Sequence, residues 1–232
     1  AVTAIAFAYM VRGRSLKWLD GLCDDIPVSV DAETGKGGDD IQLVLKGGGR
    51  CDVQVKRGLQ RGDDLWDPLL AMGKAITEGK IGFGVLAVST SSSSTIREDL
   101  ANAIFRIGDG RTDDLPEIAE AFLEKLDTAG FARSVCKTLR IVTLSAATHD
   151  GASIAAARAE LGHVCRAWTI DAAWNTLYRD GIELIDRRGR RELSSLVQLL
   201  KANNVALIDD VGSPAGLLST LADWTIRTNA TF

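Results

Sequence analysis

The segment that decides the fold runs from residue 40 to residue 56 and reads DIQLVLKGGGRCDVQVK. Apolar and polar residues alternate on both sides of three glycines, which is the pattern of two half-buried strands. Glycine accepts the positive φ that a tight reversal of the chain requires. The segment therefore predicts a β-hairpin with Gly47–Gly49 as its loop.

A three-residue loop fixes which residues lie opposite one another, with Cβ atoms roughly 5 Å apart. The expected pairs are Lys46 with Arg50, Val44 with Asp52, Gln42 with Gln54, and Asp40 with Lys56. Side chains alternate across a strand, so the even-numbered residues of both strands share one polar face. The odd-numbered residues should supply core: Ile41, Leu43, Leu45, Cys51, Val53 and Val55.

One end of the polar face gathers an acid, an amide and a lysine, namely Asp40, Gln54 and Lys56. Carboxylate and amide oxygens are hard ligands suited to Mg²⁺ or Mn²⁺. A lysine beside such a metal can orient a bound water and stabilise charge on a phosphate. The ordinary alternative is a solvated face on which an Asp–Lys pair contributes little. The chemical interpretation is favoured because helices should cover the sheet, and a covered glutamine and lysine need partners.

The order of Asp40, a hairpin and then Gln54-Val55-Lys56 resembles the QxK variant of the PD-(D/E)xK nuclease core. With Glu33 ahead of them, residues 1 to 90 resemble the DUF4297/Cap4-like and Mrr-like double-stranded DNA endonuclease domains of bacterial anti-phage defence proteins. The resemblance implies a restriction-endonuclease-like α/β fold, with a mixed central sheet flanked by helices. It further implies a core domain over residues 1–125, followed by an α/β extension over 126–232 that packs on the core or follows it.

The resemblance also assigns roles to residues. Asp40, Gln54 and the backbone carbonyl of Val55 would bind Mg²⁺ or Mn²⁺, and Lys56 would position the attacking water or stabilise the charge of the transition state. Glu33 would be a further ligand, and Asp31 competes with it for that role. A glutamine replaces the commoner acid at residue 54, which should weaken metal binding and make activity depend on assembly.

The activity implied is metal-dependent hydrolysis of DNA phosphodiester bonds. Such domains sit as N-terminal effectors ahead of a sensor or ATPase region and act as homo-oligomers. One alternative is a catalytically inactive module that keeps the nuclease fold for DNA binding or oligomerisation. Another is a nucleotide-binding or NAD-consuming effector, but neither TGKGG (34–38) nor TSSSST (90–95) matches a phosphate-binding loop.

Composition sets limits on the class of protein. The 232 residues are 46% hydrophobic and 25% charged, which is ordinary for a globular chain, and the net charge of −4 gives no overall basic signature. Four widely spaced cysteines and two histidines argue against a zinc site and predict free thiols. The apolar start, AVTAIAFAYM, precedes Arg12 and Arg14, the wrong order for a secretory signal, so a cytoplasmic protein without membrane contact is expected. Without an initial methionine, the chain reads as a fragment of a longer protein.

The remaining pattern predicts alternating helices and strands. Helices are expected at 3–22, 65–78, 96–107, 116–126, 150–162, 171–180, up to 201, and 214–225; strands are expected at 26–33, 82–89, 139–145, 182–186 and 205–208. Trp168 and Trp174 are expected to pack. The serine run after the strand at 82–89 is interpreted as a flexible linker in preference to an anion site.

Two groups of arginines are candidates for contact with DNA phosphates. Arg57 and Arg61 follow Lys56 in a polar turn, and a solvated turn is an equal alternative. The cluster RRGRR at 187–191 is the densest positive charge in the chain, although basic turns are usually just solvated.

Overall fold

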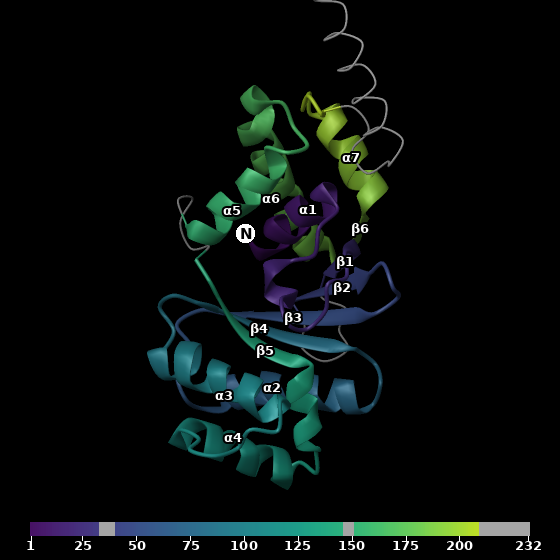
Figure 1. The fold of residues 1–232 in the computed structure, drawn as a ribbon. Coiled ribbons are helices and arrows are strands. Elements are labelled where there is room, and N and C mark those ends of the chain that lie inside the picture. Colours follow the sequence, from purple (N-terminus) through teal and green to yellow (C-terminus); the bar gives the residue numbers. More distant parts are fainter. Residues whose placement is uncertain (33–39, 146–150, 209–232) are drawn as a thin grey trace, which may run out of the picture.

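The computed structural model describes residues 1–32, 40–145 and 151–208, which form a six-stranded sheet between two helical layers (Figure 1). The strand order is β5 (Leu139–Leu144), β4 (Phe83–Ser89), β3 (Arg50–Lys56), β2 (Ile41–Leu45), β1 (Pro27–Ala32) and β6 (Arg190–Glu192). Strands β3, β4 and β5 run parallel, whereas β6, β1, β2 and β3 alternate in direction. This arrangement confirms the predicted α/β fold with a mixed central sheet flanked by helices.

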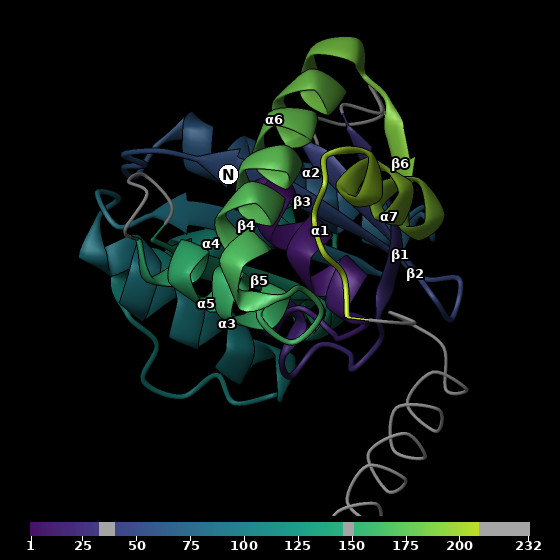
Figure 2. The same cartoon turned by 90° about the horizontal axis from the view of Figure 1, so that it is seen from above.

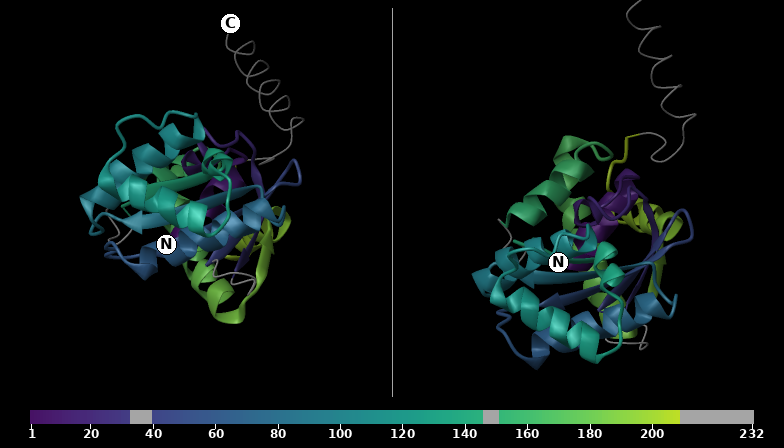
Figure 3. Two further views of the ribbon diagram at one scale, coloured as in Figure 1. Left: turned by 90° about the horizontal axis from the view of Figure 1, so that it is seen from below. Right: turned by 60° about the horizontal axis from the view of Figure 1, so that its bottom comes forward.

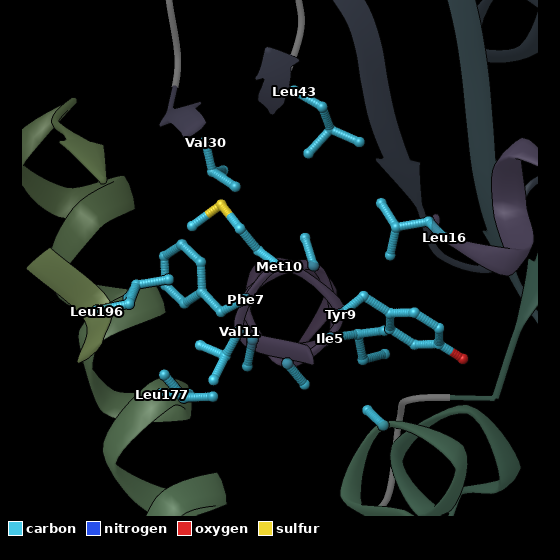
Figure 4. Packing of buried hydrophobic residues seen from close by; sticks show 14 of the residues in the cluster. Ile5, Phe7, Tyr9, Met10, Val11, Leu16, Val30, Leu43, Leu177 and Leu196 are labelled. Carbon is cyan, nitrogen blue, oxygen red and sulfur yellow. The ribbon is translucent and has the colours of Figure 1, made fainter. Parts of the chain in front are cut away.

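Helix α1 (Val2–Arg12) forms the centre of the layer on one face of the sheet. Around it pack α5 (Ala152–Leu161), α6 (Ile170–Arg187) and α7 (Leu193–Ala202), as Figure 2 shows from above. Every residue from Thr3 to Val11 is buried. Figure 4 shows why: Phe7 points toward Leu196, Met10 toward Val30, and Tyr9 to the opposite side of the helix. A helix that is apolar all round belongs in a core, and α1 occupies that position.

Helix α1 is shorter than the predicted helix at 3–22. It ends because Gly13 adopts a left-handed conformation with φ of 71°. The N–H groups of Gly13 and Arg14 then bond to the carbonyls of Met10 and Tyr9, at 3.1 Å each. Such paired bonds terminate a helix at a glycine. The chain continues into the short 3₁₀ helix η1 (Lys17–Leu19).

The second layer, seen from below in Figure 3, covers the other face of the parallel strands. It consists of α2 (Asp63–Thr77), η2 (Thr95–Leu100), α3 (Ala101–Gly108), α4 (Glu117–Thr128) and η3 (Arg133–Lys137). Leu65 and Leu69 of α2 share one apolar cluster with Leu86 of β4, and Trp66 stacks on Phe122 with ring centroids 6.3 Å apart. The helices predicted at 65–78, 96–107 and 116–126 are therefore confirmed, although η2 is π-helical.

The later part of the chain completes the same sheet. The predicted boundary at residue 125 falls inside α4, and the residues after it supply both edge strands, β5 and β6. The strand predicted at 182–186 is wrong, because α6 continues to Arg187 and its buried residues Trp174, Leu177 and Leu184 follow a helical period. Gly181 does not break this helix. A Cβ there would lie 3.2 Å from Cβ of Thr3, so the glycine allows α6 to approach α1 closely.

Two smaller predictions fail near the end of the described chain. Trp168 lies in η4 (Ala167–Thr169) with 78% of its surface exposed, so it does not pack, whereas Trp174 is buried as expected. In place of a strand at 205–208, one isolated bridge joins Leu207 to Cys165. The helix predicted at 214–225 lies outside the described residues.

Candidate active site

The hairpin at residues 41–56 forms, with a register that differs from the prediction by two residues. Ile41 pairs with Val53 and Gln42 with Asp52, and the Nε2 of Gln42 donates to Oδ1 of Asp52 at 2.7 Å. The predicted loop Gly47–Gly49 is therefore wrong, since Leu45 bonds to Gly49 across the strands. The turn begins one residue earlier than predicted, because the N–H groups of Lys46 and Gly47 donate to the carbonyl of Ile26 and the carboxylate of Asp25.

A shift of two residues leaves the faces of the hairpin unchanged, because the side-chain period of a strand is two. The odd-numbered residues Ile41, Leu43, Leu45, Cys51 and Val53 are buried in the core around α1, as predicted, and Val55 is partly buried against it. In the observed register Asp40, the residue before β2, lies beside Gln54 and Val55 of β3, whereas the prediction placed it opposite Lys56. The carboxylate Oδ2 of Asp40 accepts a short hydrogen bond from the N–H of Val55.

Asp40 and the end of β3 line a cavity of about 320 Å³ beside the carboxyl ends of β3, β4 and β5. Its polar lining consists of Thr3, Asp40, Lys56, Arg57 and Ser89, and its apolar lining includes Val55 and Leu144. The first turn of α1 and Ile185 of α6 close the opposite side. Arg57 lines the cavity together with Ala1, Val2 and Thr3, so it lies close to this first turn.

The structure brings together some of the predicted site residues and separates others. Asp40, Val55, Lys56 and Arg57 meet at the cavity. Gln54 is half-buried on β3 and is not among the residues that line the cavity, so its role stays a prediction. Arg61 is elsewhere: it lines a different cavity, and its guanidinium forms a 2.6 Å ion pair with Glu117 at the start of α4.

Glu33 lies outside the described residues. Asp31, the competing acid, is in β1, which β2 separates from β3. Its Oδ1 accepts a 3.0 Å hydrogen bond from Ser29 and lies 3.5 Å from Nε of Arg190. Asp31 does not line the cavity.

The serine run after β4 is an anchored loop and not the flexible linker that was expected. The hydroxyl of Ser89 accepts from the N–H of Gly58 at 3.1 Å, and that of Ser92 accepts from the N–H of Leu59 at 3.0 Å. The N–H of Ser93 returns a bond to the carbonyl of Leu59. We call this set of bonds between Ser89–Ser93 and Gly58–Leu59 the serine clasp. The serine clasp fixes the turn that begins directly after Lys56 and Arg57. In the sequence, the run of serines was the signal that could have indicated this role.

The arginine cluster at 187–191 is largely engaged with acids. Arg191 binds Asp180 through two nitrogens, with Nε–Oδ2 at 2.8 Å, and this hydrogen bond raises the pKa of Arg191. Arg190 pairs with Asp31 and Glu192, and Arg187 with Glu183. These ion pairs hold α6 and β6 in place. They give the positive charge of the cluster a structural role that requires no contact with DNA.

The donor chemistry at Asp40 suits a hard divalent cation. A carboxylate offers about four lone-pair sites, and the N–H of Val55 takes one of them. In the described parts of the chain no three His, Cys, Asp or Glu side chains come together. A Mg²⁺ or Mn²⁺ ion would thus rely on Asp40 together with amide, backbone or water oxygens, a pattern typical of weakly held Mg²⁺.

All four cysteines are free thiols, as predicted, and Cys51, Cys136 and Cys165 are buried. Among the described residues no helix is both long and apolar enough to span a bilayer.

Comparison with solved structures shows what the fold resembles. The chain aligns with the Cap4 SAVED/CARF-domain containing receptor of Moraxella osloensis with a TM-score of 0.52 at 11% identity, over 87% of this chain and 46% of that one. It aligns with the Cap4 SAVED/CARF-domain containing receptor of Acinetobacter baumannii, solved with the cyclic trinucleotide 3′3′3′-cAAA, with a TM-score of 0.53 at 9% identity, over 87% of this chain and 43% of that one. No family model and no curated protein matches the sequence. The chain shares the fold of a region that is less than half of each receptor.

Proposed function

We propose that this chain is a metal-dependent endonuclease domain that hydrolyses DNA phosphodiester bonds as the effector of an anti-phage defence protein. The observation that carries the proposal is the contact between the Asp40 carboxylate and the N–H of Val55, the middle residue of Gln54-Val55-Lys56. The acid and the lysine of the QxK pattern thereby meet at one cavity. The similarity in fold to part of two Cap4 receptors supports the assignment to defence.

Each residue at the cavity has a chemical task in this proposal. Asp40 and the carbonyl of Val55 would hold Mg²⁺ or Mn²⁺, with Gln54 as a further oxygen ligand. When bound, the metal supplies a water of lowered pKa and neutralises phosphate charge. Lys56 orients the attacking water and stabilises the charge on the phosphate as it develops. Arg57 holds the phosphodiester at the mouth of the cavity, where its exposed side chain can reach the DNA backbone.

The proposal extends to the assembly of the full-length protein. Because the chain covers less than half of each receptor, the sensor or ATPase region would lie elsewhere in the same polypeptide. Among the described residues only Asp40 brings a carboxylate to the cavity, and residue 54 is a glutamine, so metal binding should be weak in the isolated domain. Oligomerisation through the sensor region would then raise activity on double-stranded DNA.

The first experiment incubates supercoiled plasmid with the protein and Mn²⁺ or Mg²⁺, with EDTA as the blank. We expect nicking or linearisation that disappears in Asp40→Asn and in Lys56→Ala. The asparagine keeps an oxygen that can accept from Val55 while it removes the charge needed by the metal. Lys46→Ala is the matched control, since Lys46 is an exposed lysine at the other end of the same hairpin. Equal cleavage by Lys56→Ala and Lys46→Ala would refute the assignment of Lys56.

A second function is favoured by one comparison, because the Acinetobacter receptor was solved with a cyclic trinucleotide. If this chain corresponds to the ligand-binding part of that receptor, it should bind 3′3′3′-cAAA and should neither bind Mn²⁺ nor cleave DNA. Calorimetry with the cyclic trinucleotide and with Mn²⁺ separates the two functions. Binding of neither would favour a nuclease-fold module without catalysis, for DNA binding or oligomerisation.

A further inference from the structure

A second cavity lies at the opposite end of β5 from the candidate active site. Arg140, the second residue of β5, lines it, whereas Leu144 at the end of the strand lines the first cavity. Its volume is about 760 Å³, within the range of small-molecule sites in proteins. The turn at Gly21, the end of α3 and the 3₁₀ helix η3 form its walls.

The charge of this cavity is opposite to that of the whole chain. Arg133, Lys137 and Arg140 line it together with one acid, Asp109, whereas the chain carries a net charge of −4. Asp109 is itself engaged by Arg111, with 2.9 Å between Nη2 and Oδ2. A concave surface with a local excess of positive charge attracts and concentrates anions.

Two of the three cations are available to a ligand. Lys137 is exposed at the end of η3. Arg133 pairs with Asp127 at 3.1 Å, but both side chains are more than half exposed, and such surface pairs exchange at little cost. A phosphate placed between Arg133 and Lys137 would gain two charge-assisted hydrogen bonds.

Arg140 has a different task, since its guanidinium is already held by the surrounding protein. Its guanidinium donates to the carbonyls of Cys136, Leu139 and Gly21 at 2.8–3.0 Å, and it lies 5.0 Å from the centre of the Phe105 ring. These contacts hold Arg140 and the ring together. Phe105 is nevertheless 43% exposed, one of three large hydrophobic residues that are exposed in the described part of the chain.

We infer that this cavity binds a nucleotide, free or as one unit of a nucleic-acid strand, with its phosphate on Arg133 and Lys137 and its base against Phe105. A base stacks on aromatic side chains whatever its identity, and cations beside the aromatic ring hold the phosphate. Neither feature alone would specify a nucleotide: the cations would hold any anion, and the ring would hold any apolar group. The inference does not depend on the chain being a nuclease.

The test titrates the protein with dAMP, with a hexamer of deoxyadenylate and with inorganic phosphate, and measures each Kd by calorimetry. We expect Lys137→Ala and Arg133→Ala each to weaken binding of all three probes by about tenfold, the effect of one lost charge-assisted contact. Phe105→Leu should weaken dAMP and the hexamer by about tenfold and leave phosphate unchanged, because only the stacking contact is lost.

The controls separate this cavity from general charge and from the candidate active site. Lys125→Ala removes one exposed positive charge from α4 and should change none of the three Kd values. Lys56→Ala should likewise leave dAMP binding at this cavity unchanged. A stronger response to the hexamer than to dAMP identifies a strand as the occupant, and the reverse identifies a free nucleotide. The inference is overturned if none of the probes binds, or if Phe105→Leu affects phosphate and dAMP equally.

Discussion

Ser92 shows how a single buried hydroxyl supports the candidate active site. Its side chain is 4% exposed, and its oxygen accepts the N–H of Leu59 within the serine clasp. That N–H belongs to the turn that carries Arg57. The clasp is therefore a positioning device for the proposed phosphate contact, although none of its hydroxyls needs to touch the substrate.

We expect Ser92→Ala to lower the free energy of unfolding by about 1–3 kcal/mol, because the buried N–H of Leu59 loses its acceptor. If the clasp positions Arg57, the variant should also bind DNA more weakly at a temperature where it is fully folded. Urea denaturation and a DNA-binding titration measure the two effects. Ser91→Ala is the control, since Ser91 is exposed and its hydroxyl contacts the hydroxyl of Ser89. Equal stability of the two variants would contradict the structural role of Ser92.

Asp180 and Arg191 are a second pair whose effect can be measured residue by residue. Asp180 is 5% exposed, so removal of Arg191 leaves a buried carboxylate without its ion-pair partner. Arg191→Met should therefore destabilise the fold by about 3 kcal/mol. Arg187→Met, which breaks an exposed pair with Glu183 one turn away, should cost less than about 0.5 kcal/mol. Denaturant unfolding measures the loss in the free energy of unfolding for both variants. Similar losses would show that the buried pair with Asp180 contributes no more to stability than the exposed pair does.

At the scale of elements, two helical glycines predict opposite responses to the same substitution. A Cβ on Gly108, at the end of α3, would lie 2.8 Å from the backbone oxygen of Cys136, so α3 and η3 could no longer approach each other. A Cβ on Gly73, inside α2, would meet its nearest atom at 3.6 Å, an ordinary contact. The helix propensity of alanine then decides the outcome at residue 73.

We expect Gly108→Ala to destabilise the protein by about 1–3 kcal/mol, the usual result of overpacking. Gly73→Ala should stabilise it by about 0.5–1 kcal/mol, because alanine restricts the unfolded chain and favours the helix. The two melting temperatures, measured under the same conditions, should move in opposite directions. A shift of the same sign in both variants would mean that these contacts do not limit packing.

Elements with a clear period could be predicted from the sequence, and contacts between distant segments could not. Alternation placed the faces of the hairpin correctly, and with them the meeting of Asp40 with the Gln54-Val55-Lys56 strand. The register failed because Lys46 and Gly47 are held by Ile26 and Asp25, which no local pattern reveals. The end of α6 is a similar case: the helix continues through Gly181, where a Cβ would lie 3.2 Å from Cβ of Thr3, and no local pattern reveals this packing.

At the scale of the whole molecule, the buried thiols make stability depend on pH. Burial raises the pKa of Cys136 and of Cys165 to about 11, and it also raises the pKa of Cys51 well above its ordinary value. An unfolded thiol titrates near pH 8.5. Above about pH 8.5 the unfolded chain therefore loses protons that the folded chain keeps, so the free energy of unfolding should fall as pH rises toward 11.

The measurement is a series of urea unfolding curves from neutral to alkaline pH. When Cys136 and Cys165 are replaced by alanine, the free energy of unfolding should fall less steeply at alkaline pH than it does in the parent protein. The comparison uses the slope with pH, because the smaller core lowers stability at every pH. A fall of unchanged steepness in that double variant would assign the alkaline sensitivity to other groups.

The complete burial of α1 also has a consequence for how the chain is made. The helix packs against α5, α6 and α7, which follow it by more than a hundred residues. At a synthesis rate of about 5–20 residues per second, these partners are absent for many seconds after α1 has left the ribosome. During that time the nine buried residues of α1 lack the three helices that complete their burial, and contacts of such long sequence separation form slowly. The nascent chain should consequently be a chaperone client, and a ribosome stalled after β5 should carry a chain that aggregates on release.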